Sequence, residues 1–217
     1  MSLGLIGELA RLIVGTSLVK SAVDGLGEHL SNKNNSIAEI PDGKGKMKIK
    51  IHHVFNLEDR MVHIVNMANK SKLDPVIRQF TAEAVNKRCG TKWCISERNY
   101  WSEIRAVFKS IDENVRYTGD IWSVDTYQSG KRTLELGIAD CDDVSILIAS
   151  CLMSIGYPVR FRVIKTKNSS DWNHIFVLAG IPPRDAKQWV SLDATVDKPA
   201  GWHPPKSMIS ATKDFAV

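Results

Sequence analysis

The amino-acid sequence predicts an α+β fold in which a helical half packs on an antiparallel β-sheet. From 140 to 155, apolar residues recur at the spacing of a buried helix. Three stretches with strand-like alternation follow it, at 157–165, 173–179 and 189–194. Because the strands follow the helix as a group and do not alternate with helices, we expect the sheet to be antiparallel.

The size and composition of the chain favour one domain. With 217 residues, 43% of them hydrophobic, the chain can bury one substantial core but not two full-sized ones. We expect this domain at 47–210, followed by a tail at 211–217. Lysine and arginine exceed aspartate and glutamate by 29 to 24, but the basic residues are scattered, so no specific nucleic-acid partner is expected.

Residues 1–30 are predicted to form an amphipathic helix or docking segment. Leu5, Leu9 and Leu12 fall near helical spacing, and such a helix can pack on its own domain, on a second copy or on a larger assembly. Glu8 interrupts the apolar run, and no basic region precedes it. We therefore expect neither a transmembrane segment nor a signal peptide for secretion.

The rest of the N-terminal half is expected to contain a linker, a strand and two helices. The linker is predicted at 31–46, which is rich in Asn, Gly, Ser and Lys. From Met47 onward, apolar residues alternate with lysines, as in a half-exposed strand. Asp74 has the character of an N-cap before a helix-initiating proline, which predicts a helix at 75–88. Another helix is predicted at 99–114, with large apolar residues on one stripe: Trp101, Ile104, Val107, Phe108 and Ile111.

The four cysteines of the chain are too few for a disulfide scaffold at this length. They indicate a reducing compartment, although a disulfide between Cys89 and Cys94 stays open. Cys151 lies on the apolar stripe of the buried helix and is interpreted as a packing residue. Cys141, at the start of the same helix, is the candidate for thiol chemistry.

The position of Cys141 favours a nucleophilic thiolate. Unpaired backbone N–H groups and the helix dipole stabilise negative charge in the first helical turn. Asp140 is a natural N-cap for this helix. The carboxylates of Asp142 and Asp143 act against thiolate formation, so an imidazole partner is needed.

His174 and Asp193 are the predicted partners of Cys141. Strand alternation puts His174 on one face of its stretch and Asp193 on one face of the next. If these stretches pair, one register brings the two side chains together, and the carboxylate then selects the imidazole tautomer and stabilises the imidazolium. Singly, such a cysteine or histidine more often packs in a core, and Asp193 could cap a turn. Their joint order along the chain favours a catalytic triad.

The run at 135–143, followed by the apolar helix and the segment at 154–161, resembles the transglutaminase-like superfamily. More narrowly, it is similar to the version carried by tailed bacteriophages and prophages. The resemblance covers roughly 57–205, and Ala139 replaces the family's usual glycine. Further segments that fit it are 114–117, 126–129, 173–177, 189–195 and 201–205.

This resemblance implies a papain-like α+β fold in which Cys141, His174 and Asp193 match the family triad. The backbone N–H of Cys141 is the default donor of an oxyanion hole, and the second donor could be Gln128, Trp122 or another backbone group, of which Gln128 is preferred. Trp172 and Trp202 are expected nearest the cleft. No metal or other cofactor is expected, because the residues with zinc-ligand chemistry lack Cys-x-x-Cys or His-x-x-x-His spacing: His52, His53, His63, Cys89 and Cys94.

The implied chemistry is cysteine-dependent acyl transfer on a peptide or glutamine amide through a thioester. Water as acceptor gives a protease or amidase, whereas lysine gives a protein-crosslinking transglutaminase. The alternative is a virion or assembly protein that keeps the triad and acts mainly by binding. The expected partners are a protein or peptide substrate and, through residues 1–30, a phage virion or assembly component. Either function places the chain in the cytoplasm of a bacterial host or in a virion.

Overall fold

The computed structural model describes residues 35–41, 46–52, 56–119 and 126–217. The chain divides into two compact units, Met1–Phe55 and Asn56–Val217. In the first unit, β1 (Asn35–Pro41) and β2 (Lys46–His52) form an antiparallel hairpin. The helix predicted at 1–30 lies outside the described residues.

Strand β1 falls inside the segment expected to be a linker at 31–46, so this part of the expectation needs correction. Composition describes the segment in isolation, whereas the backbone groups of β1 find hydrogen-bonding partners on β2. The alternation that begins at Met47 does mark a strand, and it is this strand that pairs with the supposed linker. The division between the units at 55/56 also lies after the predicted boundary at 46/47.

Helices dominate the first part of the second unit: α3 (Leu57–Ser71), α4 (Pro75–Val85), α5 (Tyr100–Asn114), α6 (Gly130–Leu136) and α7 (Cys141–Ser154). Each begins after a residue whose side chain accepts a backbone N–H of the first turn, in order Asn56, Asp74, Asn99, Ser129 and Asp140. The helices predicted at 75–88 and 99–114 are present with shifted ends. Helices α3 and α6 have no counterpart among the predicted elements.

The sheet of the second unit contains β7 (Val159–Thr166), β8 (His174–Ile181), β9 (Gln188–Leu192) and β10 (Ile209–Ala216). Its strand order is β10-β7-β8-β9, and all of these neighbours are antiparallel. The tail expected at 211–217 is therefore wrong, because most of it belongs to β10. Polar residues interrupt the apolar alternation of β10, so the sequence pattern does not indicate a strand. Its antiparallel pairing with β7 stabilises the extended conformation instead.

Short strands complete the unit: β3 (Arg88–Cys89) with β4 (Lys92–Trp93), and β5 (Arg116–Tyr117) with β6 (Ile138–Ala139). The β5–β6 pair is parallel and joins the end of α5 to the segment just before α7. Cys89 and Cys94 form a disulfide at the β3–β4 hairpin. The expectation that the cysteines are reduced is therefore corrected for this pair.

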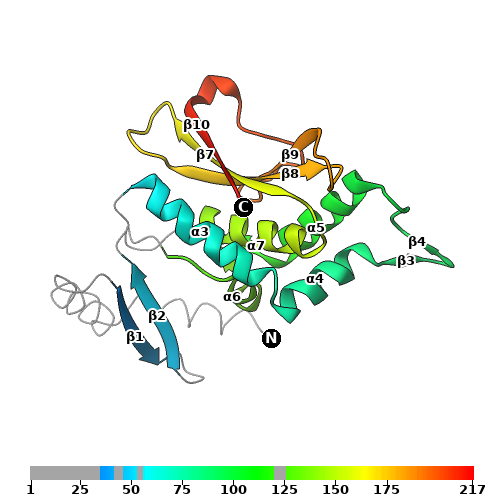
Figure 1. Cartoon of the computed structure of the whole chain (residues 1–217), viewed down its shortest axis with the longest axis horizontal. Helices are drawn as coiled ribbons and strands as arrows, with labels where there is room; N and C mark the ends of the chain where they lie inside the picture. Colours follow the sequence, from blue (N-terminus) through cyan, green and yellow to red (C-terminus); the bar gives the residue numbers. More distant parts are fainter. Residues whose placement is uncertain (1–34, 42–45, 53–55, 120–125) are drawn as a thin grey trace. The chain divides into compact units, whose positions relative to one another are not determined.

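Helix α7 is the centre of the core. It packs against β7 and β8 on one side and against α3, α4, α5 and α6 on the other, so the sheet and the helices form two layers around it (Figure 1). All of its residues from Asp142 to Leu152 are buried. A helix enclosed in this way is apolar all round, which explains the long apolar run in the sequence. The predicted α+β class, with a helical half on an antiparallel sheet, is confirmed.

Among the helices of the described residues, none combines the length and the apolar character needed to cross a membrane.

Candidate active site

Cys141 is the first residue of α7, as the sequence predicts. Its N-cap, Asp140, has an extended backbone, and its side chain accepts the backbone N–H of Asp143 at 2.9 Å. Cys141 is partly exposed, whereas the other free cysteine of the described residues, Cys151, is buried. The first turn of α7 therefore presents one thiol that a reagent can reach.

His174 and Asp193 form the predicted contact. Strands β8 and β9 pair with Val177 opposite Leu192, a register that puts both side chains on the same face as diagonal neighbours. His174 Nε2 lies 2.7 Å from Asp193 Oδ2. Because an ionised carboxylate only accepts hydrogen bonds, Nε2 carries a proton, and in the neutral imidazole Nδ1 then holds the lone pair. The imidazole is thus in the tautomer that can accept a proton at Nδ1.

The second oxygen of Asp193 is held by Thr195, which the sequence analysis did not single out. Thr195 donates to Asp193 Oδ1 through its backbone N–H at 3.1 Å and its hydroxyl at 2.6 Å. The Asp193 side chain is 1% exposed and that of His174 is 19% exposed. Burial alone raises the pKa of Asp193, but its bonds with His174 and Thr195 outweigh burial and lower the pKa. Asp193 is therefore an ionised, rigidly held partner for the imidazole.

One contact joins α7 to β8 next to the imidazole. One helical turn after Cys141, the Ser145 hydroxyl donates to the backbone carbonyl of Ile175 at 3.3 Å. The backbone of Ile175 also lowers the pKa of the Cys141 thiol. Ile175 directly follows His174, so this contact brings the start of α7 to the beginning of β8.

The surroundings of Cys141 nevertheless favour the neutral thiol. Burial raises the pKa of Cys141, and the carboxylates of Asp142 and then Asp140 add to this effect. The Ile175 backbone and the Arg60 guanidinium oppose it without cancelling it. Dipole stabilisation at the helix start is therefore not enough for ionisation, and a base has to remove the thiol proton.

Gln128 lies against the first turn of α7. Its backbone N–H and its side-chain Nε2 each donate to the Asp143 carboxylate at 2.6 Å. Among the residues that the structure describes, none hydrogen-bonds to the buried side-chain oxygen of Gln128. Gln128 thus ties its loop to α7, and at least one N–H of its side-chain amide is occupied before any oxyanion could form. The other candidate donor, Trp122, lies outside the described residues.

The predicted cleft tryptophans occupy different surroundings. Trp172, in the connection between β7 and β8, is partly buried against the main core close to His174 in sequence. Trp202 is also partly buried, and its backbone N–H donates to the Pro199 carbonyl at 3.1 Å. In the described part of the chain, no hydrogen bond or aromatic ring contact joins Trp202 to the His174–Asp193 pair.

The residues weighed as zinc ligands do not come together in the described structure. His63 lies edge-on to Tyr127 at 5.7 Å between ring centroids, and Cys89 and Cys94 are in the disulfide. The side chain of His52 and all of His53 lie outside what the structure describes. Within the described residues, no group of three or more His, Cys, Asp or Glu could hold a metal ion.

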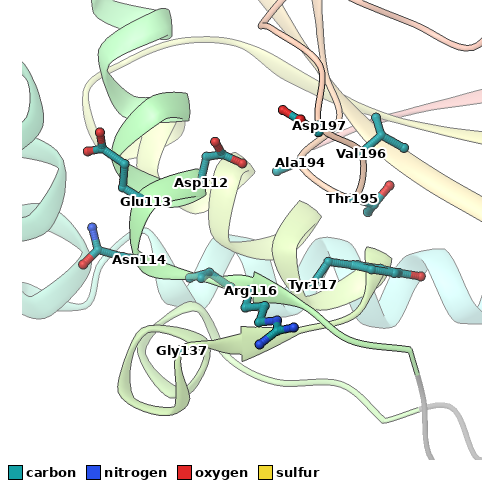
Figure 2. Close-up of a pocket in the computed structure, with 11 residues that line it drawn as sticks. Asp112, Glu113, Asn114, Arg116, Tyr117, Gly137, Ala194, Thr195, Val196 and Asp197 are labelled. Carbon is teal, nitrogen blue, oxygen red and sulfur yellow. The ribbon is translucent and has the colours of Figure 1, made fainter. Parts of the chain in front are cut away.

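A pocket of about 400 Å³ adjoins the carboxylate end of the site. Figure 2 shows it between the last turn of α5, the β5 strand and the loop at 194–197. Thr195 lines this pocket and also holds Asp193, but Cys141, His174 and Asp193 do not line it. The pocket therefore adjoins the His174–Asp193 pair through Ala194 and Thr195, which follow Asp193 in the chain.

An ion pair between Arg60 on α3 and Asp142 on α7 is a further contact at the site that sequence reasoning did not foresee. Arg60 Nη2 lies 2.6 Å from Asp142 Oδ2. The apolar periodicity of 57–71 could have predicted α3, with Leu57, Met61, Ile64 and Ala68 at helical spacing. No local signal could have paired two residues that are 82 positions apart.

A cysteine at a helix start and a His–Asp pair on neighbouring antiparallel strands are the elements from which papain-like cysteine-dependent hydrolases and acyltransferases build their sites. Residues 91–194 match the family model described as the transglutaminase-like superfamily. The matched segment contains Cys141, His174 and Asp193. The fold class is accordingly papain-like and transglutaminase-like.

Among solved structures, the chain is similar to a crystal structure described as a "putative cysteine protease" from Cytophaga hutchinsonii. The two share 14% sequence identity with a TM-score of 0.45. The match covers 82% of this chain and 66% of the other, so this chain spans just under two thirds of that protein's length. The comparison with curated proteins gives no match.

Proposed function

We propose that this chain catalyses acyl transfer on a peptide or glutamine amide, with Cys141 as nucleophile, His174 as general base and Asp193 as the residue that orients His174. The observation that carries the proposal is the 2.7 Å contact between His174 Nε2 and the buried Asp193 carboxylate. That contact leaves Nδ1 as the proton acceptor on a residue adjacent to Ile175, whose carbonyl accepts a hydrogen bond from Ser145, one helical turn after Cys141. A structural histidine would not require an ionised, buried carboxylate partner.

The geometry supports a general-base mechanism. His174 Nδ1 takes the thiol proton as the sulfur forms a bond to the carbonyl carbon, and the carbonyl oxygen becomes an oxyanion. The backbone N–H of Cys141 is a donor for this oxyanion. When the C–N bond breaks, the imidazolium gives its proton to the leaving amine, and a thioester remains on Cys141. Water or a second amine then attacks the thioester, with His174 again as base.

The acyl acceptor decides between two activities within this proposal. Water releases the acid and makes the chain a protease or amidase, whereas a lysine amine makes it a protein-crosslinking transglutaminase. We further propose a phage-associated role, in a bacterial host cytoplasm or a virion, with residues 1–30 as the docking element. This part is supported by the sequence resemblance of the segments around Cys141, and a virion or assembly role without turnover is its alternative.

Reaction with an electrophilic glutamine or peptide probe, read by intact mass, tests the proposed chemistry. The wild-type chain should gain one probe per molecule at Cys141. Cys141→Ala should gain none, and His174→Ala should react much more slowly. Labelling that survives Cys141→Ala, or a wild-type rate in His174→Ala, would show that these residues are not a catalytic pair.

Incubation of the thioester-forming chain with water alone or with an added primary amine separates the two activities. An amide product would identify a transglutaminase, and a free acid would identify a hydrolase. No turnover with any amide, together with stoichiometric presence in purified particles, would instead favour the assembly role.

A further inference from the structure

An ion pair from another helix reaches the residue next to the candidate nucleophile. Arg60 on α3 contacts Asp142 Oδ2 at 2.6 Å, and the Asp142 side chain is 3% exposed while that of Arg60 is 21% exposed. A carboxylate so far removed from water is poorly screened by solvent and salt. The negative charge of the Asp142 carboxylate therefore acts on nearby groups, and the Arg60 guanidinium decides how much of that charge is offset.

The same carboxylate faces the thiol. Asp142 Oδ1 lies 4.0 Å from the Cys141 sulfur, so Asp142 is bound by a guanidinium at one oxygen and faces the nucleophile with the other. A like charge within about 4–6 Å disfavours ionisation of the group beside it. In agreement with this geometry, Asp142 raises the pKa of Cys141 and Arg60 lowers it.

We propose that Arg60 is a positioning residue for Cys141: by binding Asp142 it holds this carboxylate in place and offsets its charge at the sulfur. Its relevance to turnover rests on the proposed function, because the charge at Cys141 affects catalysis only if this thiol is the nucleophile. Arg60 belongs to α3, outside the segment at 91–194 that matches the superfamily model. The chemistry of the matched segment therefore depends on a helix that precedes it.

The groups around the sulfur come from α3, α7 and β8. Helix α7 contributes the carboxylates of Asp140 and Asp142, and α3 contributes the Arg60 guanidinium. Strand β8 contributes the backbone of Ile175 and carries His174 at its start. Arg60 opposes the Asp142 carboxylate directly, so its replacement should change the ionisation of Cys141 through Asp142.

The pH dependence of Cys141 alkylation in the full-length chain tests this proposal. Iodoacetamide reacts with the thiolate, and peptide mass spectrometry reports each thiol separately. Arg60→Gln should move the midpoint of the Cys141 profile upward by about one pH unit, and Asp142→Asn should move it downward by about as much. Arg60→Lys, which keeps the positive charge, should stay near the wild-type midpoint.

The double variant Arg60→Gln/Asp142→Asn separates an action through Asp142 from a direct one. If Arg60 acts through Asp142, the upward shift caused by Arg60→Gln should vanish in the Asp142→Asn background. Arg162→Gln is the matched control, because Arg162 forms a comparable ion pair with Asp214, at 2.7 Å, on the sheet between β7 and β10. This control should leave the Cys141 profile unchanged.

A wild-type profile in folded Arg60→Gln, or a shift that persists unchanged in the double variant, overturns the proposal. If Arg60→Gln does not fold, Asp142→Asn decides, since a midpoint that does not fall shows that Asp142 exerts no charge effect on Cys141. Alkylation requires no substrate, so the outcome is distinct from that of the proposed function. If the alkylation midpoint of Cys141 shifts as expected but no acyl transfer is found, this inference holds and the proposed enzymatic function is refuted.

Discussion

Asp193→Asn perturbs the candidate triad with almost no change in shape. In the wild-type chain, Oδ1 accepts both the backbone N–H and the hydroxyl of Thr195, while Oδ2 contacts His174 Nε2. The Thr195 backbone N–H can only donate, so the oxygen of the asparagine amide has to stay at the Oδ1 position. The amide NH₂ then faces His174 Nε2 and donates to it. This moves the imidazole proton to Nδ1, which can no longer accept the proton of the Cys141 thiol.

The expected loss follows from this change of tautomer. Turnover should fall by roughly 100- to 10,000-fold, the range for loss of an orienting carboxylate, which corresponds to about 2.7–5.4 kcal/mol of transition-state stabilisation. Alkylation of Cys141 should slow as well, because the imidazolium loses its counter-charge and the thiolate fraction falls. Fold and ligand binding should persist, since every hydrogen bond of Asp193 has a replacement in the asparagine variant.

The pH dependence of stability gives the same substitution a second readout. The pKa of Asp193 is lowered in the folded chain, so its ionised form stabilises the fold above the unfolded-state value near 4, and this contribution is lost as pH falls through the lower folded-state value. Asp193→Asn removes the titration. The difference in unfolding free energy between the two proteins should therefore be largest above about pH 4 and shrink below it.

Steady-state turnover, Cys141 alkylation and chemical unfolding across pH are the assays. Asp171→Asn and Asp197→Asn are the controls, because both carboxylates lie near the site in sequence but make no contact with His174 in the described structure. Should Asp193→Asn react at the wild-type rate while one of the controls does not, the orienting carboxylate has been assigned to the wrong residue.

Three further outcomes are expected. Cys141→Ala should abolish acyl transfer but change the free energy of unfolding by less than about 1 kcal/mol, because this residue is only partly buried. If urea unfolding instead shows a loss of stability typical of a core truncation, Cys141 has a structural role. In the folded chain Cys141 should alkylate far faster than Cys151, because Cys141 is partly exposed whereas Cys151 is fully buried. Cys89 and Cys94 should react only after reduction, and equal labelling of Cys141 and Cys151 would contradict the assignment. Removal of 1–55 should leave a folded domain with a reactive thiol, because the second unit contains its own core, and aggregation of the shortened chain would show otherwise.

Sequence patterns predicted the parts of the site that depend on local periodicity. The helix that starts at Cys141 follows from its apolar spacing and from Asp140 as N-cap, and the contact of His174 with Asp193 follows from alternation in two adjacent strands. When two antiparallel strands are joined by a short connection, only a few pairing registers are possible. A shift of the register by one residue moves a side chain to the opposite face of the sheet, so only every second register puts His174 and Asp193 on the same face. These inferences therefore needed no knowledge of distant contacts.

The features that escaped prediction depend on contacts between distant segments. Arg60 contacts Asp142, which lies 82 positions away in the sequence. Gln128 lies in a loop and donates its side-chain amide to Asp143, so this N–H is not available to an oxyanion. Strand β10 has polar residues within its pattern and is specified by its partner β7, just as β1 is specified by β2. In each case the deciding energy comes from a partner that local composition does not reveal.

The carboxylates at the start of α7 explain why the candidate nucleophile sits where ionisation is difficult. Asp140 caps the helix, Asp142 binds α3 through Arg60, and Asp143 binds the loop that contains Gln128. These bonds join three segments at one helical turn, so the acidic residues cannot be removed without loosening the place where Cys141 is held. Their charges disfavour a standing thiolate, and the proton must therefore leave during the reaction and not before it. A base already in the correct tautomer meets that requirement, which is why the buried Asp193 carboxylate matters as much to this site as the thiol itself.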